Sequence, residues 1–179
     1  IAVKGYGLDQ AIEDIRNQVG ENTVILSVLN GVDSEQRVIE AYGEDKVLYS
    51  YMRVSVVMKD GCTSYDPALG NIHFGEKLNE EGAYTDRVLA VKEVFDRCGI
   101  MNIIDPDMIK GIWFKFMCNV GENLTCALLG IPFGVFRTSD HANAIRRKAM
   151  EEVVLIAQEL GVDLGKEDMD RQESTLMAL

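Results

Sequence analysis

The sequence has few of the residues from which metal centres are built. It contains two histidines among 179 residues, and its four cysteines follow no CxxC or mixed Cys/His spacing. A structural zinc site needs about four such ligands at short spacing, so we expect no metal centre. The cysteines are instead predicted to be reduced thiols in the core of a cytoplasmic protein; they are Cys62, Cys98, Cys118 and Cys126.

Positive charge is also scarce. The chain carries 18 Lys and Arg residues against 29 Asp and Glu residues, which gives a net charge of −11. Binding to a phosphate backbone requires a basic surface, so we expect no nucleic-acid partner. The densest basic run, Arg146 to Lys148, precedes Glu151 and Glu152 and is predicted to be a solvated helix face.

Long apolar runs are missing as well. No stretch of the sequence is apolar for long enough to span a bilayer, so we expect no membrane partner. The hydrophobic content of 47% and the charged content of 26% are ordinary for a globular protein. The chain begins at Ile1 inside an apolar segment and stops at Leu179 inside an amphipathic pattern. From these two ends we expect a fragment of a longer protein.

The first part of the chain alternates between strand and helix patterns. A short apolar strand precedes Lys4, apolar residues at helical spacing follow over residues 8–19, and residues 23–29 form a nearly continuous apolar run. Such a run is typical of a strand covered on both faces of a parallel sheet. A helix is then predicted over residues 34–42 with Ser34 as its N-cap. This order predicts a doubly wound α/β sheet.

Lys4 and Asn30 each follow one of the first two predicted strands. Ligands of doubly wound sheets lie beyond the carboxyl ends of the strands, so these two side chains could converge on one crevice. The local pattern also fits simpler interpretations. Asn30 and Gly31 both tolerate a positive φ and could form a plain turn, and Lys4 could be a solvated loop lysine.

Residues 46–77 alternate polar and apolar residues and predict a strand followed by antiparallel strands. His73 lies in one of them, and a strand histidine is more often a packing residue than a base. A helix is predicted over residues 84–98, with Val88, Leu89, Val91, Val94 and Phe95 facing inward and Gly99 at its end.

Helices dominate the rest of the chain. Asp105 is predicted to cap the next helix, with Pro106 at its first position and helical structure over residues 107–130. Ser139 or Asp140 is predicted to cap a helix that continues to Leu160, and residues 166–179 are predicted to begin a further helix. We therefore expect two domains, residues 1–105 and residues 106–179.

The helix predicted over residues 107–130 has an unusual polar face. At about 100° per residue, Lys115, Asn119, Glu122 and Asn123 fall on one side of it. The opposite side is predicted to form an apolar packing stripe of Trp113, Phe116, Met117, Val120, Leu124, Ala127 and Leu128.

Two interpretations of this polar face stay open. Few charges lie on it, so it could look into a cleft where Lys115 meets an anion or an acid, because an unpaired buried lysine is costly. Alternatively, Lys115 pairs with Glu122 or with another acid, and the polar face only stabilises the helix.

Four segments resemble the ketopantoate reductase (2-dehydropantoate 2-reductase) family. They are VKGY after the first predicted strand, LNGV after the second, NIHFGE among the antiparallel strands, and IWFKFMCNVGENLTCAL on the long helix. The last is the most specific, since it places Lys, Asn and Asn at four-residue spacing. The resemblance covers nearly all of the chain. It implies that residues 1–105 are part of an NADP-binding Rossmann-like domain without its first βαβ unit and GxGxxG turn. It also implies that residues 106–179 begin a helical catalytic and substrate-binding domain.

The resemblance also implies roles for five residues. Lys4 would lie near the NADPH phosphates and ribose, and Asn30 would contact both the nicotinamide and the substrate. Lys115 would be the catalytic lysine that donates to the ketone oxygen, while Asn119 and Asn123 would hold the substrate. No family role transfers to Glu122, which could tune Lys115 or be a surface acid.

The function implied is NADPH-dependent reduction of 2-dehydropantoate, with a 2-keto acid as the small-molecule partner and a homodimer as a possible assembly. A positioned ammonium can stabilise the charge that develops on the ketone oxygen as hydride arrives, which fits the polar helix face. A reductase of another 2-keto acid of the same fold stays open, as does a non-catalytic scaffold. We expect this chain alone to lack activity, because the pyrophosphate-binding turn is not in it.

Overall fold

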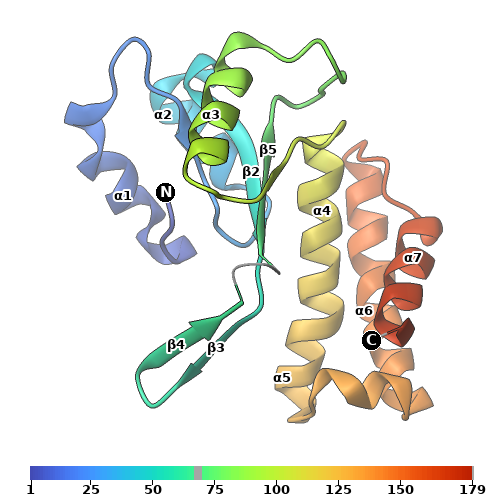
Figure 1. Ribbon diagram of the computed structural model, residues 1–179. Helices are drawn as coiled ribbons and strands as arrows, with labels where there is room; N and C mark the ends of the chain where they lie inside the picture. Colours follow the sequence, from blue (N-terminus) through green and yellow to red (C-terminus); the bar gives the residue numbers. More distant parts are fainter. Residues whose placement is uncertain (67–69, 179) are drawn as a thin grey trace. The chain divides into compact units, whose positions relative to one another are not determined.

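The computed structural model describes residues 1–66 and 70–178. The chain forms two compact units, Ile1–Met108 and Ile109–Leu179. The first unit combines strands with helices, and the second is helical (Figure 1). The prediction of an α/β sheet followed by a helical part is therefore confirmed.

The first unit contains short helices and six strands in its described residues. In chain order they are η1 (Gly5–Gly7), α1 (Leu8–Asp14), η2 (Arg16–Gln18), β1 (Ile25–Leu26), α2 (Ser34–Tyr42), η3 (Glu44–Lys46), β2 (Val47–Arg53), β3 (Val56–Lys59), β4 (Cys62–Tyr65), β5 (Asn71–Gly75), α3 (Asp86–Arg97) and β6 (Asn102–Ile103).

Four of these strands form one mixed sheet in the order β1-β2-β5-β6. β1 runs parallel to β2, β2 antiparallel to β5, and β5 parallel to β6. Residues 1–3 do not form the predicted strand. Instead, the Ile1 amino group donates to the Leu26 carbonyl (2.5 Å) and the Val28 amide donates to the Ile1 carbonyl (3.0 Å). This pairing continues the parallel direction of β1 at the edge of the sheet.

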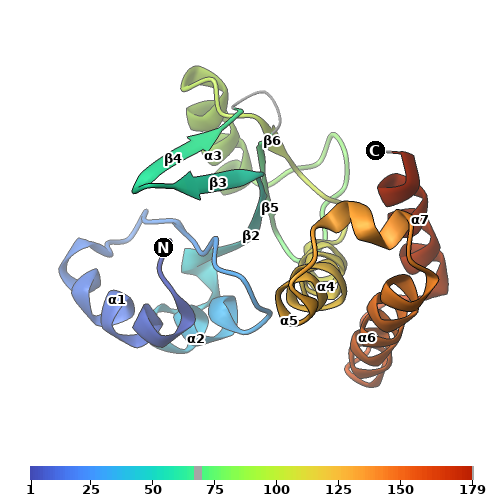
Figure 2. The ribbon, with the colours of Figure 1, turned by 90° about the horizontal axis from the view of Figure 1, so that it is seen from below.

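Helices cover both faces of the sheet (Figure 2). Val47 packs into a core cluster with residues of α1 and α2, whereas its neighbour Leu48 packs with Phe74 and Val88 on the side of α3. Successive residues of a strand point to opposite faces, so β2 supplies both cores. The prediction for α3 is wrong at two positions, because Leu89 and Val94 are 47% and 54% exposed. Of the five residues predicted to face inward, Val88, Val91 and Phe95 pack against the sheet.

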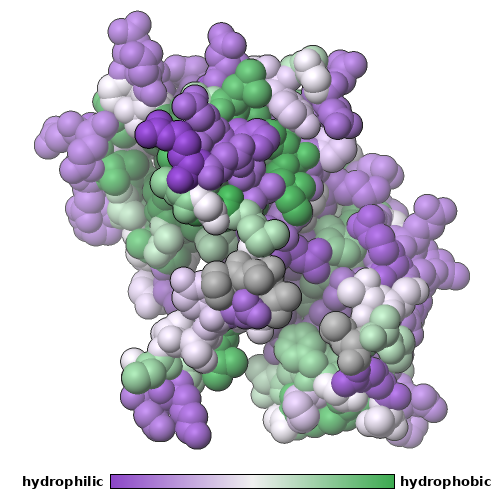
Figure 3. Space-filling view, in the orientation of Figure 1, coloured by the Kyte–Doolittle hydropathy of each residue, from purple (hydrophilic) through white to green (hydrophobic). Residues whose placement is uncertain are grey.

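β3 and β4 form a separate two-stranded hairpin. Every residue of both strands is exposed, including Val56, Val57, Met58 and Tyr65. Hydrophobic and hydrophilic side chains lie side by side over this hairpin (Figure 3). Cys62 in β4 is exposed, as is Cys98 after α3. The prediction that all four cysteines are core residues is therefore wrong for these two, because the hairpin and the end of α3 contribute little to the core.

Three residues that were predicted at helix starts lie elsewhere in the structure. Asp33, not Ser34, occupies the N-cap position of α2. Asp105 does not cap the helix that follows it, because its carboxylate accepts bonds from Tyr51 and His73 of the sheet. That helix begins at Met108, so Pro106 precedes the helix and is not its first residue.

The second unit consists of α4 (Met108–Cys118), a π-helical segment (Asn119–Leu124), α5 (Thr125–Leu129), η6 (Phe133–Arg137), α6 (Asp140–Glu159) and α7 (Lys166–Ala178). Ser139 caps α6 by accepting a bond from the Ala142 amide (3.3 Å), as predicted. Gly130 and Gly161 follow α5 and α6 with φ values of 66° and 77°. These are left-handed conformations that glycine adopts without a steric penalty. No helix within residues 1–66 and 70–178 has the length and apolarity needed to cross a membrane.

Candidate functional site

Lys4 and Asn30 lie at the same end of the first unit. The parallel pairing places Ile1 opposite Ser27, and each predicted site residue follows three positions later. Both side chains are exposed. Gly31 has a φ of 117°, so the backbone after Asn30 turns through a conformation that favours glycine. The carboxyl end of β1 thus presents an ammonium group and an amide beside a sharp turn.

A buried polar cluster lies directly behind this turn, and the sequence reasoning missed it. The Ser27 hydroxyl donates to Ser34 (2.8 Å), and the Ser34 hydroxyl donates to the Glu35 carboxylate (2.9 Å). Ser50 of β2 donates to the Ser27 carbonyl (2.8 Å). Burial raises the pKa of Glu35, and its hydrogen bonds to Ser34 and to backbone amides offset part of that effect. The cluster ties the segment after β1 to the first turn of α2 and to β2.

His73 lies in a second polar cluster. Its Nδ1 atom is 2.9 Å from Asp105 Oδ2, and the hydroxyl of Tyr51 donates to the same carboxylate oxygen (2.7 Å). The rings of Tyr51 and His73 stack with centroids 4.3 Å apart. The packing role predicted for His73 is consistent with these contacts, and the cluster fastens the segment before α4 to the sheet.

The second unit presents Lys115, Asn119 and Asn123 along one helical rod. Lys115 lies near the end of α4 and is partly buried, Asn119 opens the π-helical segment and is partly buried, and Asn123 is exposed. A π-helix bonds residue i to i+5 and turns by roughly 80–85° per residue instead of about 100°. With this ideal geometry Asn123 falls about 0–20° from Lys115, whereas an unbroken α-helix would place it about 80° away.

Glu122 does not share the face of Lys115, so that prediction is wrong. The π-helical turn rotates it about 70° away from Lys115 into the packed side of the helix. It is 5% exposed, and its Oε1 atom accepts a bond from Arg146 Nη1 (2.9 Å) and another from Gln172 Nε2 (3.0 Å). Glu122 is therefore a buried partner of α6 and α7, and not a surface acid.

Two other expectations for this unit are also wrong. Arg146 was expected on a solvated face, but it is 0% exposed because it pairs with Glu122. The apolar stripe does not continue past the π-helical segment: Leu124 and Leu128 are 61% and 80% exposed, and Ala127 is exposed. The rotation of the helix by the π turn moves these residues outward and buries Gly121, Glu122 and Thr125 in their place.

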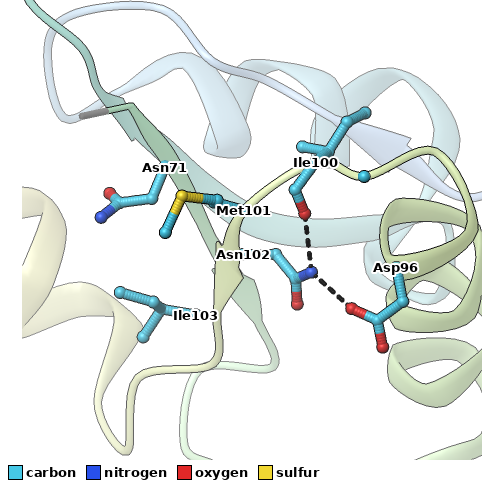
Figure 4. Close-up of a pocket in the computed structure, with 7 residues that line it drawn as sticks. Asn71, Asp96, Ile100, Met101, Asn102 and Ile103 are labelled. Atoms are coloured by element: carbon cyan, nitrogen blue, oxygen red, sulfur yellow. Dashed lines mark hydrogen bonds between the residues drawn. The ribbon is translucent and has the colours of Figure 1, made fainter. Parts of the chain in front are cut away.

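A separate pocket of about 360 Å³ lies along the edge strand β6 (Figure 4). The Asn102 amide donates to Asp96 (2.8 Å) and to the Ile100 carbonyl (3.0 Å). The Oδ1 atom of Asn71, which also lines the pocket, is buried and has no hydrogen-bond partner among the described residues. The five predicted site residues are all among those that the structure describes, and none of them lines this pocket.

Comparison with protein families gives matches over both units. The family model described as "Ketopantoate reductase PanE/ApbA" matches residues 1–79, and the model of its C-terminal domain matches residues 107–178. Among curated proteins, the 2-dehydropantoate 2-reductase of Aquifex aeolicus is 25% identical over 162 residues, which are 88% of this chain and 51% of that protein. The chain thus spans about half the length of the curated relatives that it matches.

Solved structures show the same fold. The 2-dehydropantoate 2-reductase of Porphyromonas gingivalis W83 aligns with a TM-score of 0.83 at 22% identity, over 99% of this chain and 61% of that one. A structure titled as the complex of D-mandelate dehydrogenase with NADH aligns with a TM-score of 0.78 at 17% identity, over 97% of this chain and 57% of that one.

Proposed function

We propose, from the premise that this chain belongs to the ketopantoate reductase family, that the protein reduces 2-dehydropantoate to pantoate with NADPH. The observation that carries the proposal is the π-helical turn over Asn119–Leu124, whose twist would bring Asn123 to the same side of the rod as Lys115 and Asn119. One cation and two amides in line form a set that can hold a small 2-keto acid by its oxygen atoms.

Lys115 would act at the keto group. Its ammonium would donate a hydrogen bond to the ketone oxygen, stabilise the negative charge that develops there and supply the proton. Asn119 and Asn123 would orient the carboxylate and the hydroxyl of the substrate, because neutral amides bind these groups without competing for the proton. Loss of either amide would therefore appear mainly as a higher KM, because these hydrogen bonds hold the substrate before the reaction as well as during it.

The cofactor would lie at the carboxyl end of β1, which is where sheets of this class bind nucleotides. The residues present fit a nicotinamide dinucleotide. The ammonium of Lys4 can bind phosphate oxygens, and the amide of Asn30 can form a hydrogen bond to the carboxamide group of the nicotinamide or to the substrate. When bound, a reduced nicotinamide supplies the hydride. The homodimer and the preference for NADPH over NADH rest on the family resemblance alone.

The test is an assay of NADPH oxidation with 2-dehydropantoate in the full-length protein. Substitution Lys115→Ala should lower kcat by about 10²–10³-fold, the usual loss for one group that stabilises an oxyanion, while NADPH binding is retained. Lys110→Ala is the matched control on the same helix, because Lys110 pairs with Asp163 and Asp168 and should not affect turnover. An active Lys115→Ala variant would refute the role of the lysine.

A reduction of another 2-keto acid is the second candidate, and the likeness to a structure titled D-mandelate dehydrogenase favours it. A panel of 2-keto acids with both NADPH and NADH separates the two, because the highest kcat/KM identifies the substrate. An unaltered protein that binds NADPH but reduces none of the acids would instead indicate a scaffold that kept the fold.

A further inference from the structure

The π-helical segment lies in the middle of the rod that carries all three predicted substrate contacts in the second unit. Asn119 is its first residue and Asn123 its fifth. Segments of this kind are rare, cost hydrogen-bond geometry and are often found at functional sites. A rod that kept α-helical bonding would bury a different set of residues, so something in the surrounding structure must select the π turn.

The selecting contacts come from α6 and α7. Arg146 of α6 donates to Glu122 (2.9 Å) and to Asn143 (2.8 Å), and Gln172 of α7 donates to both carboxylate oxygens of Glu122 (3.0 and 3.1 Å). Arg146 Nη2 lies 3.7 Å from Glu173. In the π register Glu122 turns toward these partners, whereas α-helical spacing would place its carboxylate about 20° from Lys115.

A buried ion pair is a weak source of net stability, because apolar residues of the same size usually do as well. Its best-attested benefit is to fix one register among several, since a displaced charge would be left buried without its partner. Arg146 is 0% exposed, so an α-helical register would leave this guanidinium without its closest carboxylate. The pair therefore raises the free energy of the α-helical register by more than it stabilises the folded state relative to the unfolded state.

The close approach of α6 adds a second constraint on the same turn. Gly121 precedes Glu122, and a Cβ atom at this position would overlap Met150 Cγ and lie 3.2 Å from the Arg146 carbonyl oxygen. Met150 is fully buried. The glycine lets the backbone of the π turn lie directly against α6, which runs beside the rod (Figure 1).

We propose that Glu122 and Arg146 are positioning residues, whose buried pair holds the π turn and thereby keeps Asn123 in line with Lys115. The proposal rests on the proposed function for the roles of Asn123 and Lys115. Loss of the pair should therefore weaken binding of the 2-keto acid through Asn123. It should affect neither the chemical step nor the binding of the cofactor.

The test uses a triple variant of the full-length protein, Glu122→Leu with Arg146→Met and Gln172→Leu, so that no charge or amide is left buried without a partner. The KM for the 2-keto acid should rise about 10- to 100-fold, the loss expected for one hydrogen bond to a charged group. The kcat should stay within about 3-fold, and the KM for NADPH should not change. Glu151→Leu with Lys148→Met is the control, since it removes an exposed pair from the same helix α6.

The decisive comparison adds Asn123→Ala. If the pair acts through Asn123, then Asn123→Ala alone should raise KM as much as the triple variant does, and the combination should raise it by no more than about 2-fold further. A crystal structure of the triple variant should show α-helical bonding through residues 119–124, with Asn123 turned away from Lys115.

The remaining outcomes overturn one proposal or the other. A π turn that persists in the triple variant, or KM effects that multiply when Asn123→Ala is added, overturns the positioning role. An unaltered protein that reduces no 2-keto acid overturns the proposed function, and the crystal structure of the triple variant then decides alone whether the pair sets the register.

Discussion

Replacing Gly121 with alanine should destabilise the second unit, although alanine is the better helix former. In a helix interior the change gains about 1 kcal/mol of intrinsic propensity. The new methyl group would overlap Met150 Cγ and lie 3.2 Å from a backbone carbonyl of α6, and both neighbours are held in a packed core. Overpacking of this kind costs about 1–3 kcal/mol, and more where a helix must move. The overlap with Met150 Cγ is severe, so the upper end of this cost applies, and subtracting the gain leaves an expected net loss of roughly 2 kcal/mol in the free energy of unfolding.

Urea unfolding of the two proteins measures this loss directly. Gly165→Ala controls for the added methyl group alone, because a Cβ atom at Gly165 meets nothing within 4 Å and this glycine lies directly before α7, outside the helix interior. Adding Met150→Ala to Gly121→Ala should recover part of the stability, since the smaller side chain makes room for the methyl group, and the two effects should not be additive. A Gly121→Ala protein as stable as the control variant would refute the claim that α6 and the π turn touch at this glycine.

Two further predictions follow from buried carboxylates. Glu122→Ala should lower the free energy of unfolding by about 3–5 kcal/mol, because it removes the closest carboxylate from the buried Arg146. Glu151→Ala, which removes a partner from the more exposed pair with Lys148, should have no measurable effect in the same urea titration. Burial raises the pKa of Glu35, so its folded state holds the proton more tightly and loses stability as pH rises from the ordinary carboxyl range through that raised value. Glu35→Gln should remove this loss, and parallel pH curves for the two proteins would contradict it.

Local signals in the sequence were sufficient for most of the elements. The helices α1, α2, α3, α6 and α7 were predicted from apolar spacing, and Ser139 and Gly161 marked the ends of α6 because capping depends on a few neighbouring residues. The strand and helix order gave the α/β class for the same reason. The predicted strand over residues 23–29 is shorter in the structure, where β1 covers Ile25–Leu26.

The candidate site could be predicted only in part. Four-residue spacing groups Lys115, Asn119 and Asn123 as a candidate set, and their role in a site stays a prediction. A turn of about 100° per residue also places Glu122 with them, which the structure contradicts. The register is set by Arg146, which lies 24 positions away in the sequence, so no local pattern contains it. The run that includes Arg146 looked solvated for the same reason: its buried partner belongs to another helix.

The four cysteines differ in solvent exposure, so their reactivity can report on local opening of the structure. Cys62 and Cys98 are exposed in the first unit, whereas Cys118 is buried at the end of α4 and Cys126 is partly covered in α5. Burial and the nearby Glu122 raise the pKa of the Cys126 thiol, which leaves less of the reactive thiolate. A maleimide pulse followed by peptide mass mapping would thus modify the first pair at once. Cys118 should react more slowly, and its rate of modification would measure how often the rod opens transiently. This experiment needs neither an added fluorophore nor a ligand.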